Sequence, residues 1–98
     1  METNMKIELD IGKEFPEITG SNADEFAKEL MKIEDSDYKE VVLDFGSTKA
    51  ISSMAMGSLF ATYQKMASQN RRIKIVNPND SIVRLLRMVN MHDLLESE

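Results

Sequence analysis

The chain has 98 residues, 42% of them hydrophobic and 30% charged, a composition typical of one soluble globular domain spanning residues 1–98. It contains no cysteine, which excludes disulfides, thiolate metal sites and a cysteine nucleophile. Its 12 basic and 17 acidic residues give a net charge of −5, which disfavours a nucleic acid partner. No apolar run is long enough to cross a bilayer and no signal-like segment opens the chain. We therefore expect a cytoplasmic protein without membrane contact.

The first third of the chain predicts two strands and a helix. Residues 5–11 alternate apolar and polar side chains, which is typical of an outer strand with one face on the core. Residues 15–19 predict a second short strand, and a proline restricts it to an edge or to a strand start. Asn22 and Glu25 form a capping-box pattern, so a helix should begin there and end where residues 35–37 break its apolar stripe.

The middle of the chain predicts a central strand, a loop and a second helix. Val41–Phe45 is apolar on both faces, which indicates a strand covered by helices on both sides. A loop at Gly46–Lys49 follows, and the helix should run from Ser52 or Ser53 to about Ser68. Its inner stripe is expected to contain Met56, Leu59, Phe60, Tyr63, Met66 and Ala67.

The last third predicts a third buried strand around Ile73–Val76 and a final helix. Asn79 or Asp80 should cap that helix, and Asn90 should end it in a left-handed conformation. Its inner side chains are expected to be Ile82, Leu85, Leu86 and Val89, followed by a packed turn at residues 91–95. Alternating strands and helices with short connections indicate an α/β domain whose parallel strands are joined by right-handed crossovers.

A candidate site follows from this topology. In open parallel sheets, ligands and partners meet the carboxyl ends of the strands. That edge contains Asp44, the loop Gly46–Lys49, and the two serines Ser52 and Ser53 at a helix start. Unpaired N–H groups at such a start favour negative charge, including that of a phosphoserine. A serine in this position is also the usual helix cap, so both interpretations remain open.

The order of the motifs resembles a known family. Val41–Phe45 followed by Ala50–Gly57 resembles the STAS domain pattern of a V-L-D-L strand followed by x-I-D-S-S-G-L-G at a helix start. Tyr63–Lys65, Ile75–Pro78 and Leu85–Leu95 resemble later motifs of the same family, so the resemblance covers essentially the whole chain. It implies a mostly parallel central sheet of about four to five strands with an antiparallel N-terminal edge strand, flanked by about four helices.

The resemblance is to the anti-sigma factor antagonist branch, which implies a bacterial regulator of sigma-factor-dependent transcription. The implied partner is an anti-sigma factor with a GHKL-type serine kinase domain, which phosphorylates the second serine of D-S-S-G and is bound by the unphosphorylated form. Ser52 stands where that motif has Asp, Ser53 matches the first serine, and Met54 occupies the phosphorylated position. Ala55 replaces the first glycine, and Gly57 matches the second. Met54 has no hydroxyl and cannot accept a phosphoryl group.

We therefore expect an interaction module without enzymatic activity, cofactor or metal, monomeric or weakly dimeric. Its binding surface should be the loop Gly46–Ile51 and the helix from Ser52 to about Phe60. Ser53 is the expected phosphoacceptor, with Ser52 as the alternative. Met54 either offers an exposed apolar surface to a partner or packs on the core. The expected contact residues are Asp44, Ser47, Thr48, Ser52, Ser53, Met54 and Gly57.

Two other functions stay open. The first is a standalone STAS subunit of a lipid transport complex or a sensory scaffold, permanently active because Met54 removes the phosphate switch. The second is a small phosphocarrier or enzyme that uses His92 or Ser53. No second catalytic group is identifiable near His92, which favours a surface or capping role for it. Met56, Met66 and Met88 are expected to fill the core.

Overall fold

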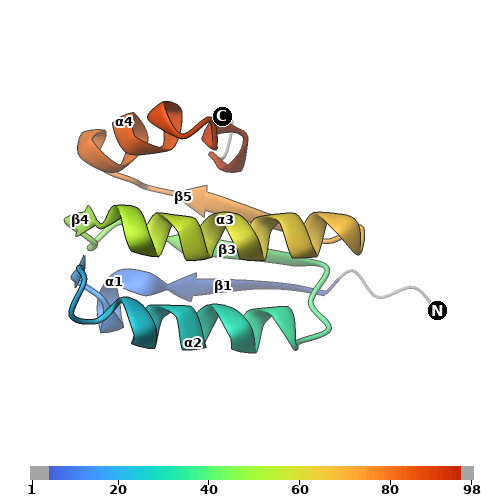
Figure 1. Ribbon diagram of the computed structural model, residues 1–98. Coiled ribbons are helices and arrows are strands. Elements are labelled where there is room, and N and C mark those ends of the chain that lie inside the picture. Colours follow the sequence, from blue (N-terminus) through green and yellow to red (C-terminus); the bar gives the residue numbers. More distant parts are fainter. Residues whose placement is uncertain (1–4, 96–98) are drawn as a thin grey trace.

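The structure, a computed structural model, describes residues 5–95, so residues 1–4 and 96–98 of the expected domain lie outside it. Strands and short or long helices alternate along the chain (Figure 1). In chain order they are β1 Lys6–Asp10, α1 Ile11–Glu14, β2 Glu17–Ile18, α2 Ala23–Glu34, β3 Glu40–Asp44, β4 Ala50–Ile51, α3 Ser53–Ser68, β5 Arg72–Val76, α4 Asp80–Met88 and the 3-10 turn η1 His92–Leu94.

The main sheet has the strand order β1-β3-β5, and all its strands are parallel. Strands β2 and β4 form a separate parallel pair. The expected antiparallel N-terminal edge strand is therefore wrong for residues 5–95, and the expected single sheet of four to five strands is replaced by a sheet of three and a pair. The physical reason lies in the connection between β1 and β3, because a crossover that contains a helix returns the chain in its original direction.

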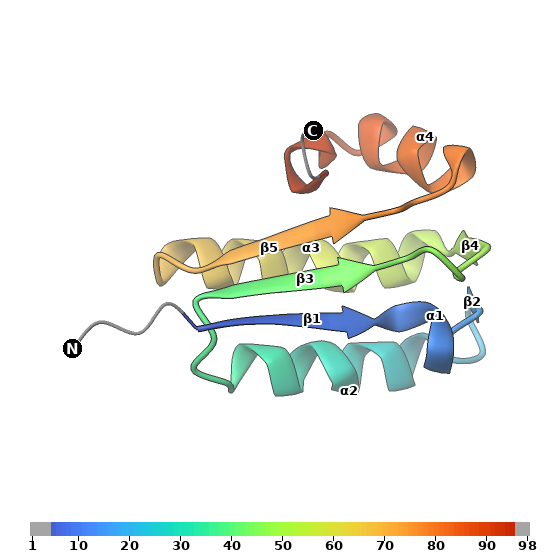
Figure 2. The ribbon, with the colours of Figure 1, turned by 180° about the vertical axis from the view of Figure 1, so that it is seen from behind.

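Helices α2 and α3 cover one face of the main sheet (Figure 1). Figure 2 shows the opposite face, where strands lie in front of α3 and α2 runs below β1 in the view. The prediction that helices cover β3 on both sides is thus wrong. Val42 is only 4% exposed. It shares a face with its register neighbours Glu8 and Lys74, residue types whose aliphatic stems can cover an apolar side chain while their charges stay in water.

The core lies between the main sheet and the two long helices. The inward side chains of β3 and β5 are almost completely buried, and they meet apolar side chains of α2 and α3. Burying each side chain of this size stabilises the fold by roughly 1.5–3 kcal/mol. Phe15 closes one end of the core, where its ring meets that of Phe26 edge-on at a centroid distance of 5.6 Å. The principal members are Phe26, Leu30, Val41, Leu43, Phe45, Leu59, Met66, Ile73 and Ile75.

Helix α3 begins after Ser52, as predicted, and Met56 and Met66 are buried. The predicted inner stripe is too wide, however, because Phe60 is 39% exposed and Ala67 is also exposed. The helix contacts the sheet on one side and α2 on another, and the side chains outside this sector face solvent.

Helix α4 confirms both predicted ends. The Asn79 carboxamide oxygen accepts from the N–H of Ile82 at 2.9 Å, and Asn90 has a φ of 61°. The predicted inner position of Val89 and the core role of Met88 are wrong, since these side chains are 43% and 74% exposed. This short helix lies beyond the β5 edge of the sheet, so only its side toward the domain is covered (Figure 1).

The predicted capping box at the start of α2 is also wrong. Asn22 precedes the helix, but its side chain makes no capping bond. Its amide donates to the carbonyl oxygen of Glu17 at 2.8 Å, and its carboxamide oxygen accepts from the N–H of Thr19. The side chain therefore ties together the loop between β2 and α2, a local use that competes with helix capping.

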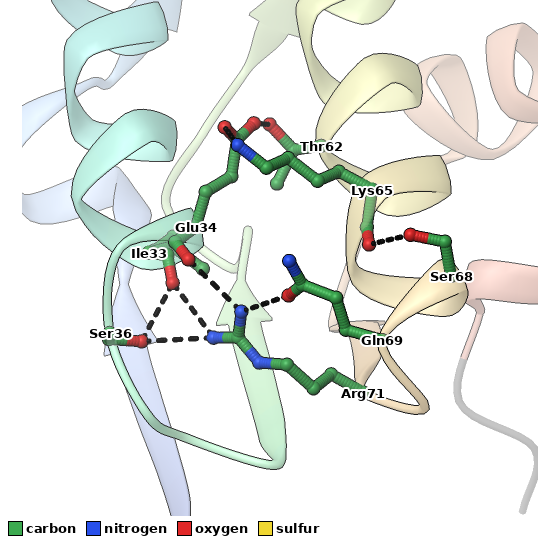
Figure 3. Close-up of polar contacts among 8 residues, drawn as sticks. All are labelled: Ile33, Glu34, Ser36, Thr62, Lys65, Ser68, Gln69 and Arg71. Carbon is green, nitrogen blue, oxygen red and sulfur yellow. Dashed lines mark hydrogen bonds and ion pairs between the residues drawn. The ribbon is translucent and has the colours of Figure 1, made fainter.

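Arg71 fastens the carboxyl end of α2 to the start of β5 (Figure 3). Arg71 belongs to the short basic cluster at residues 70–74, and such a cluster often lies in a solvated turn. The Arg71 side chain is nevertheless partly buried. Two of its bonds reach carbonyl oxygens of the last turn of α2, which a cation satisfies well. The acceptors are the carbonyl oxygens of Ile33, Glu34 and Tyr38 and the side chains of Ser36 and Gln69.

A second polar contact joins α2 directly to α3. The buried hydroxyl of Thr62 donates to the Glu34 carboxylate at 2.6 Å, and Lys65 pairs with the same carboxylate at 3.5 Å (Figure 3). Because the partners come from both helices, these bonds fix the position of α3 along the axis of α2 as well as the distance between the two helices.

Candidate functional site

The carboxyl end of β3 leads into a loop that is held by side-chain hydrogen bonds. One oxygen of the Asp44 carboxylate accepts from the N–H of Gly46 at 2.8 Å and from the side-chain amide of Asn77 at 3.2 Å. The Asn79 amide donates to the carbonyl oxygen of Lys49 at 2.8 Å. Asp44 thus braces the loop. The bracing asparagines were not among the predicted site residues, although Asn77, with a φ of 59°, belongs to a turn motif visible in the sequence.

Thr48, one of the predicted contact residues, does not face solvent. It is 2% exposed, and its hydroxyl donates to the carbonyl oxygen of Phe15 at 3.0 Å. The N–H of Lys49 donates to the carbonyl oxygen of Pro16 at 2.7 Å, which continues the same connection. Of the two predicted contact residues in this loop, Thr48 therefore secures it from inside, and Ser47 is exposed.

The loop also approaches the first helix very closely. A Cβ atom added to Gly12 would lie 2.5 Å from the Cβ of Ser47 and 2.8 Å from its Cα. Only a residue without a side chain allows this approach. The absence of a side chain at Gly12 therefore determines how closely Ser47 can approach α1. Gly12 is not among the predicted site residues.

The start of α3 presents the two serines differently. The Ser52 hydroxyl oxygen accepts from the N–H of Ala55 at 3.2 Å, so this serine is the helix cap. Ser53 is the first residue of the helix and is exposed. Met54 follows with 66% exposure, whereas Met56 is 2% exposed. The two alternatives left open for Met54 are thereby decided: its side chain faces solvent, and Met56 fills the core.

Gly57 lies on the exposed side of α3, and no heavy atom outside its immediate surroundings comes within 4 Å of the position that a Cβ would take. The fold itself therefore does not require a glycine there. A glycine inside a helix costs roughly 0.5–1 kcal/mol relative to alanine. Nearby, the half-exposed Phe60 ring packs against Tyr63 at a centroid distance of 6.3 Å. Met54, Gly57 and Phe60 thus give the first half of α3 a largely uncharged surface, which we call the α3 surface.

His92 is exposed in η1, a turn that packs on α4 and β5, and within residues 5–95 it pairs with its chain neighbour Asp93 at 3.7 Å. The structure does not bring it together with Ser53. Within residues 5–95, no three His, Asp or Glu side chains gather where they would hold a metal ion. None of the helices in this range is long and apolar enough to span a membrane.

Comparison with known proteins now defines the class. The STAS domain model matches residues 16–97, and the chain belongs to the STAS domain family. Curated protein sequences give no match.

Solved structures share the fold. The unphosphorylated anti-sigma factor antagonist SpoIIAA is similar over 100% of this chain and 84% of its own, with a TM-score of 0.74 and 13% identity. Phosphorylated SpoIIAA of Bacillus has a TM-score of 0.70 and 10% identity over 100% of this chain and 86% of its own. A putative anti-sigma factor antagonist of Thermotoga maritima has a TM-score of 0.68 and 17% identity over 99% of this chain and 77% of its own.

Proposed function

We propose that this protein is a binding module of the anti-sigma factor antagonist type, which acts by contacting an anti-sigma factor with a GHKL-type serine kinase domain. Membership of the STAS family and the likeness to two anti-sigma factor antagonists support this class of function. The module acts in the cytoplasm by binding and not by catalysis.

The observation that carries the proposal is the α3 surface. Met54 is exposed at the start of the helix, and Gly57 leaves open space beside it that the fold does not use. Exposed methionine adapts to different partner shapes, and a glycine lets a partner backbone approach the helix closely. The braced loop with Ser47 borders this surface and supplies polar contacts at its rim.

The test is an affinity capture from the lysate of the native host, with retained proteins identified by mass spectrometry. Wild type is compared with Met54→Asp, and Met88→Asp is the matched control because Met88 is an equally exposed methionine on another helix. We expect a GHKL-type kinase with wild type and the control, and its loss with Met54→Asp. Retention of the same kinase by Met54→Asp would reject the α3 surface as the contact.

Ser53 is the residue we propose for any remaining phosphate switch. It is exposed at the first position of α3, where helix N–H groups favour negative charge, whereas the Ser52 hydroxyl already caps the helix. Incubation with the captured kinase and ATP, followed by peptide mapping, should place a phosphoryl group on Ser53 and not on Ser52. A protein that stays unmodified would mean that the switch is absent.

The exposed Met54 also favours a second candidate, a permanently active STAS subunit of a lipid transport complex or a sensory scaffold. In that case the same capture retains membrane transport subunits or sensory proteins in place of a kinase. A phosphocarrier or enzyme using His92 has less support, because among residues 5–95 the one charged partner of His92 is its neighbour Asp93. An acid-labile phosphohistidine would favour it.

A further inference from the structure

A second surface lies at the opposite side of the sheet from α4, along the free edge of β1. In the order β1-β3-β5, β1 is the outer strand, and among residues 5–95 no strand pairs with its outer side. Both ribbon views show α2 running beside this edge (Figures 1 and 2). Two clefts are lined by residues of both this strand and this helix, which therefore form the walls of a groove.

The backbone of β1 is directed so that it can pair with another strand. The carbonyl oxygen of Met5 accepts from the N–H groups of Lys39 and Glu40, so Met5 faces β3. Successive residues of a strand direct their backbone groups to alternate sides. Lys6 and Glu8 consequently present both their N–H and their C=O groups to the outside. Asp10 presents its N–H there, whereas its carbonyl oxygen belongs to the first turn of α1. An added strand would bond to these outward groups.

The groove beneath this edge is continuous and has an apolar floor. Two clefts of about 360 and 180 Å³ run between β1 and α2, and both are lined by Leu9 and Ile33. Ile7 and Leu9 of β1 are only partly buried, so apolar surface remains for side chains that enter from outside. The length of β1, five residues, suits one extended segment.

The charges along the groove specify its occupant. Among residues 5–95, Lys13 is the only basic residue lining the larger cleft, against the four carboxylates of Glu8, Asp10, Glu14 and Glu29. In the smaller cleft the only charged residues of this described range are Glu29 and Lys32, which pair with each other at 3.1 Å. A segment that fits has alternating apolar residues for the floor and Lys or Arg at the end that reaches the larger cleft.

We propose that the groove between β1 and α2 binds an extended, basic-ended segment of a partner protein as an additional edge strand. This surface is separate from the α3 surface.

The proposal is tested by selecting binders from a display library of random peptides about ten residues long. Peptides of this length can form one strand of ordinary length. We expect enriched peptides to alternate apolar residues and to end in Lys or Arg. On titration of such a peptide, NMR amide shifts should appear at Lys6, Glu8 and Asp10. Glu8→Pro removes an outward N–H without removing a bond to β3 and should weaken binding about tenfold or more. Asp10→Lys should do the same, whereas the matched charge change Asp93→Lys should not.

Three results would overturn the proposal. The first is the absence of enriched peptides, and the second is amide shifts confined to the start of α3. The third is a dimer of the protein alone that Glu8→Pro dissociates, which would make a second copy the occupant. Thermal unfolding of the Glu8→Pro variant is the control that separates a loss of binding from a loss of the fold. None of these results depends on the α3 surface, so the proposed function stands or falls separately.

Discussion

Replacing Arg71 by methionine keeps the aliphatic stem and removes the guanidinium group that joins α2 to β5. Three backbone carbonyl oxygens lose a charged donor, two of them in the last turn of α2. Hydrogen bonds to charged groups contribute roughly 1.5–3 kcal/mol each. At this half-buried site, water replaces part of the hydrogen bonding that the guanidinium group provides. The contributions of the individual bonds are also not additive. We expect the free energy of unfolding to fall by about 3 kcal/mol.

Urea unfolding followed by circular dichroism measures this change. The matched control is Arg72→Met, because Arg72 is the next residue and makes one exposed ion pair with Glu40 at 3.2 Å. An exposed pair contributes less than about 1 kcal/mol. If the two variants differ from each other by less than about 0.5 kcal/mol, Arg71 does not fasten the two elements and the reasoning fails.

Alanine substitutions at Gly12 and Gly57 are expected to change the stability of the protein in opposite directions. Gly12→Ala places a Cβ 2.5 Å from Ser47, so the loop has to shift, and we expect about 1–3 kcal/mol of destabilisation in the same urea assay. An unchanged free energy of unfolding would show that the loop with Ser47 can move away from residue 12 at little cost. Gly57→Ala meets no atom within 4 Å and should stabilise α3 by about 0.5–1 kcal/mol while leaving the fold intact. Lower stability would mean that the glycine serves the fold and not the α3 surface.

The elements that the sequence predicts well are those with local signals. Helix α3 has a serine cap and a regular apolar period, and β3 is apolar on both faces, so both were located correctly. Asn79 and Asn90 likewise act within their own helix. Each of these features depends on residues a few positions apart, which a single sequence displays directly.

The errors have two origins, a choice between local alternatives and contacts between distant parts of the chain. Asn22 is of the first kind, because it has the sequence pattern of a cap, yet its side chain bonds to the nearby loop residues Glu17 and Thr19. The remaining errors are of the second kind. Met88 has the spacing of a core residue but lies on a helix at the edge of the sheet. The same limit applies to the candidate site. Its segment was predicted, but the inward position of Thr48 depends on Phe15, which is 33 residues away.

The bracing of the loop after β3 has a consequence for the thermodynamics of association. A flexible loop loses conformational entropy when a partner fixes it, at roughly 1–2 kcal/mol for each backbone residue. Here Asp44, Asn77 and Asn79 already hold the loop before any partner arrives. Folding has therefore already met this entropy cost, so the partner that we propose would meet a loop that is already ordered. A variant such as Asn79→Ala should consequently bind that partner with a more unfavourable entropy, although Asn79 is not one of the proposed contact residues.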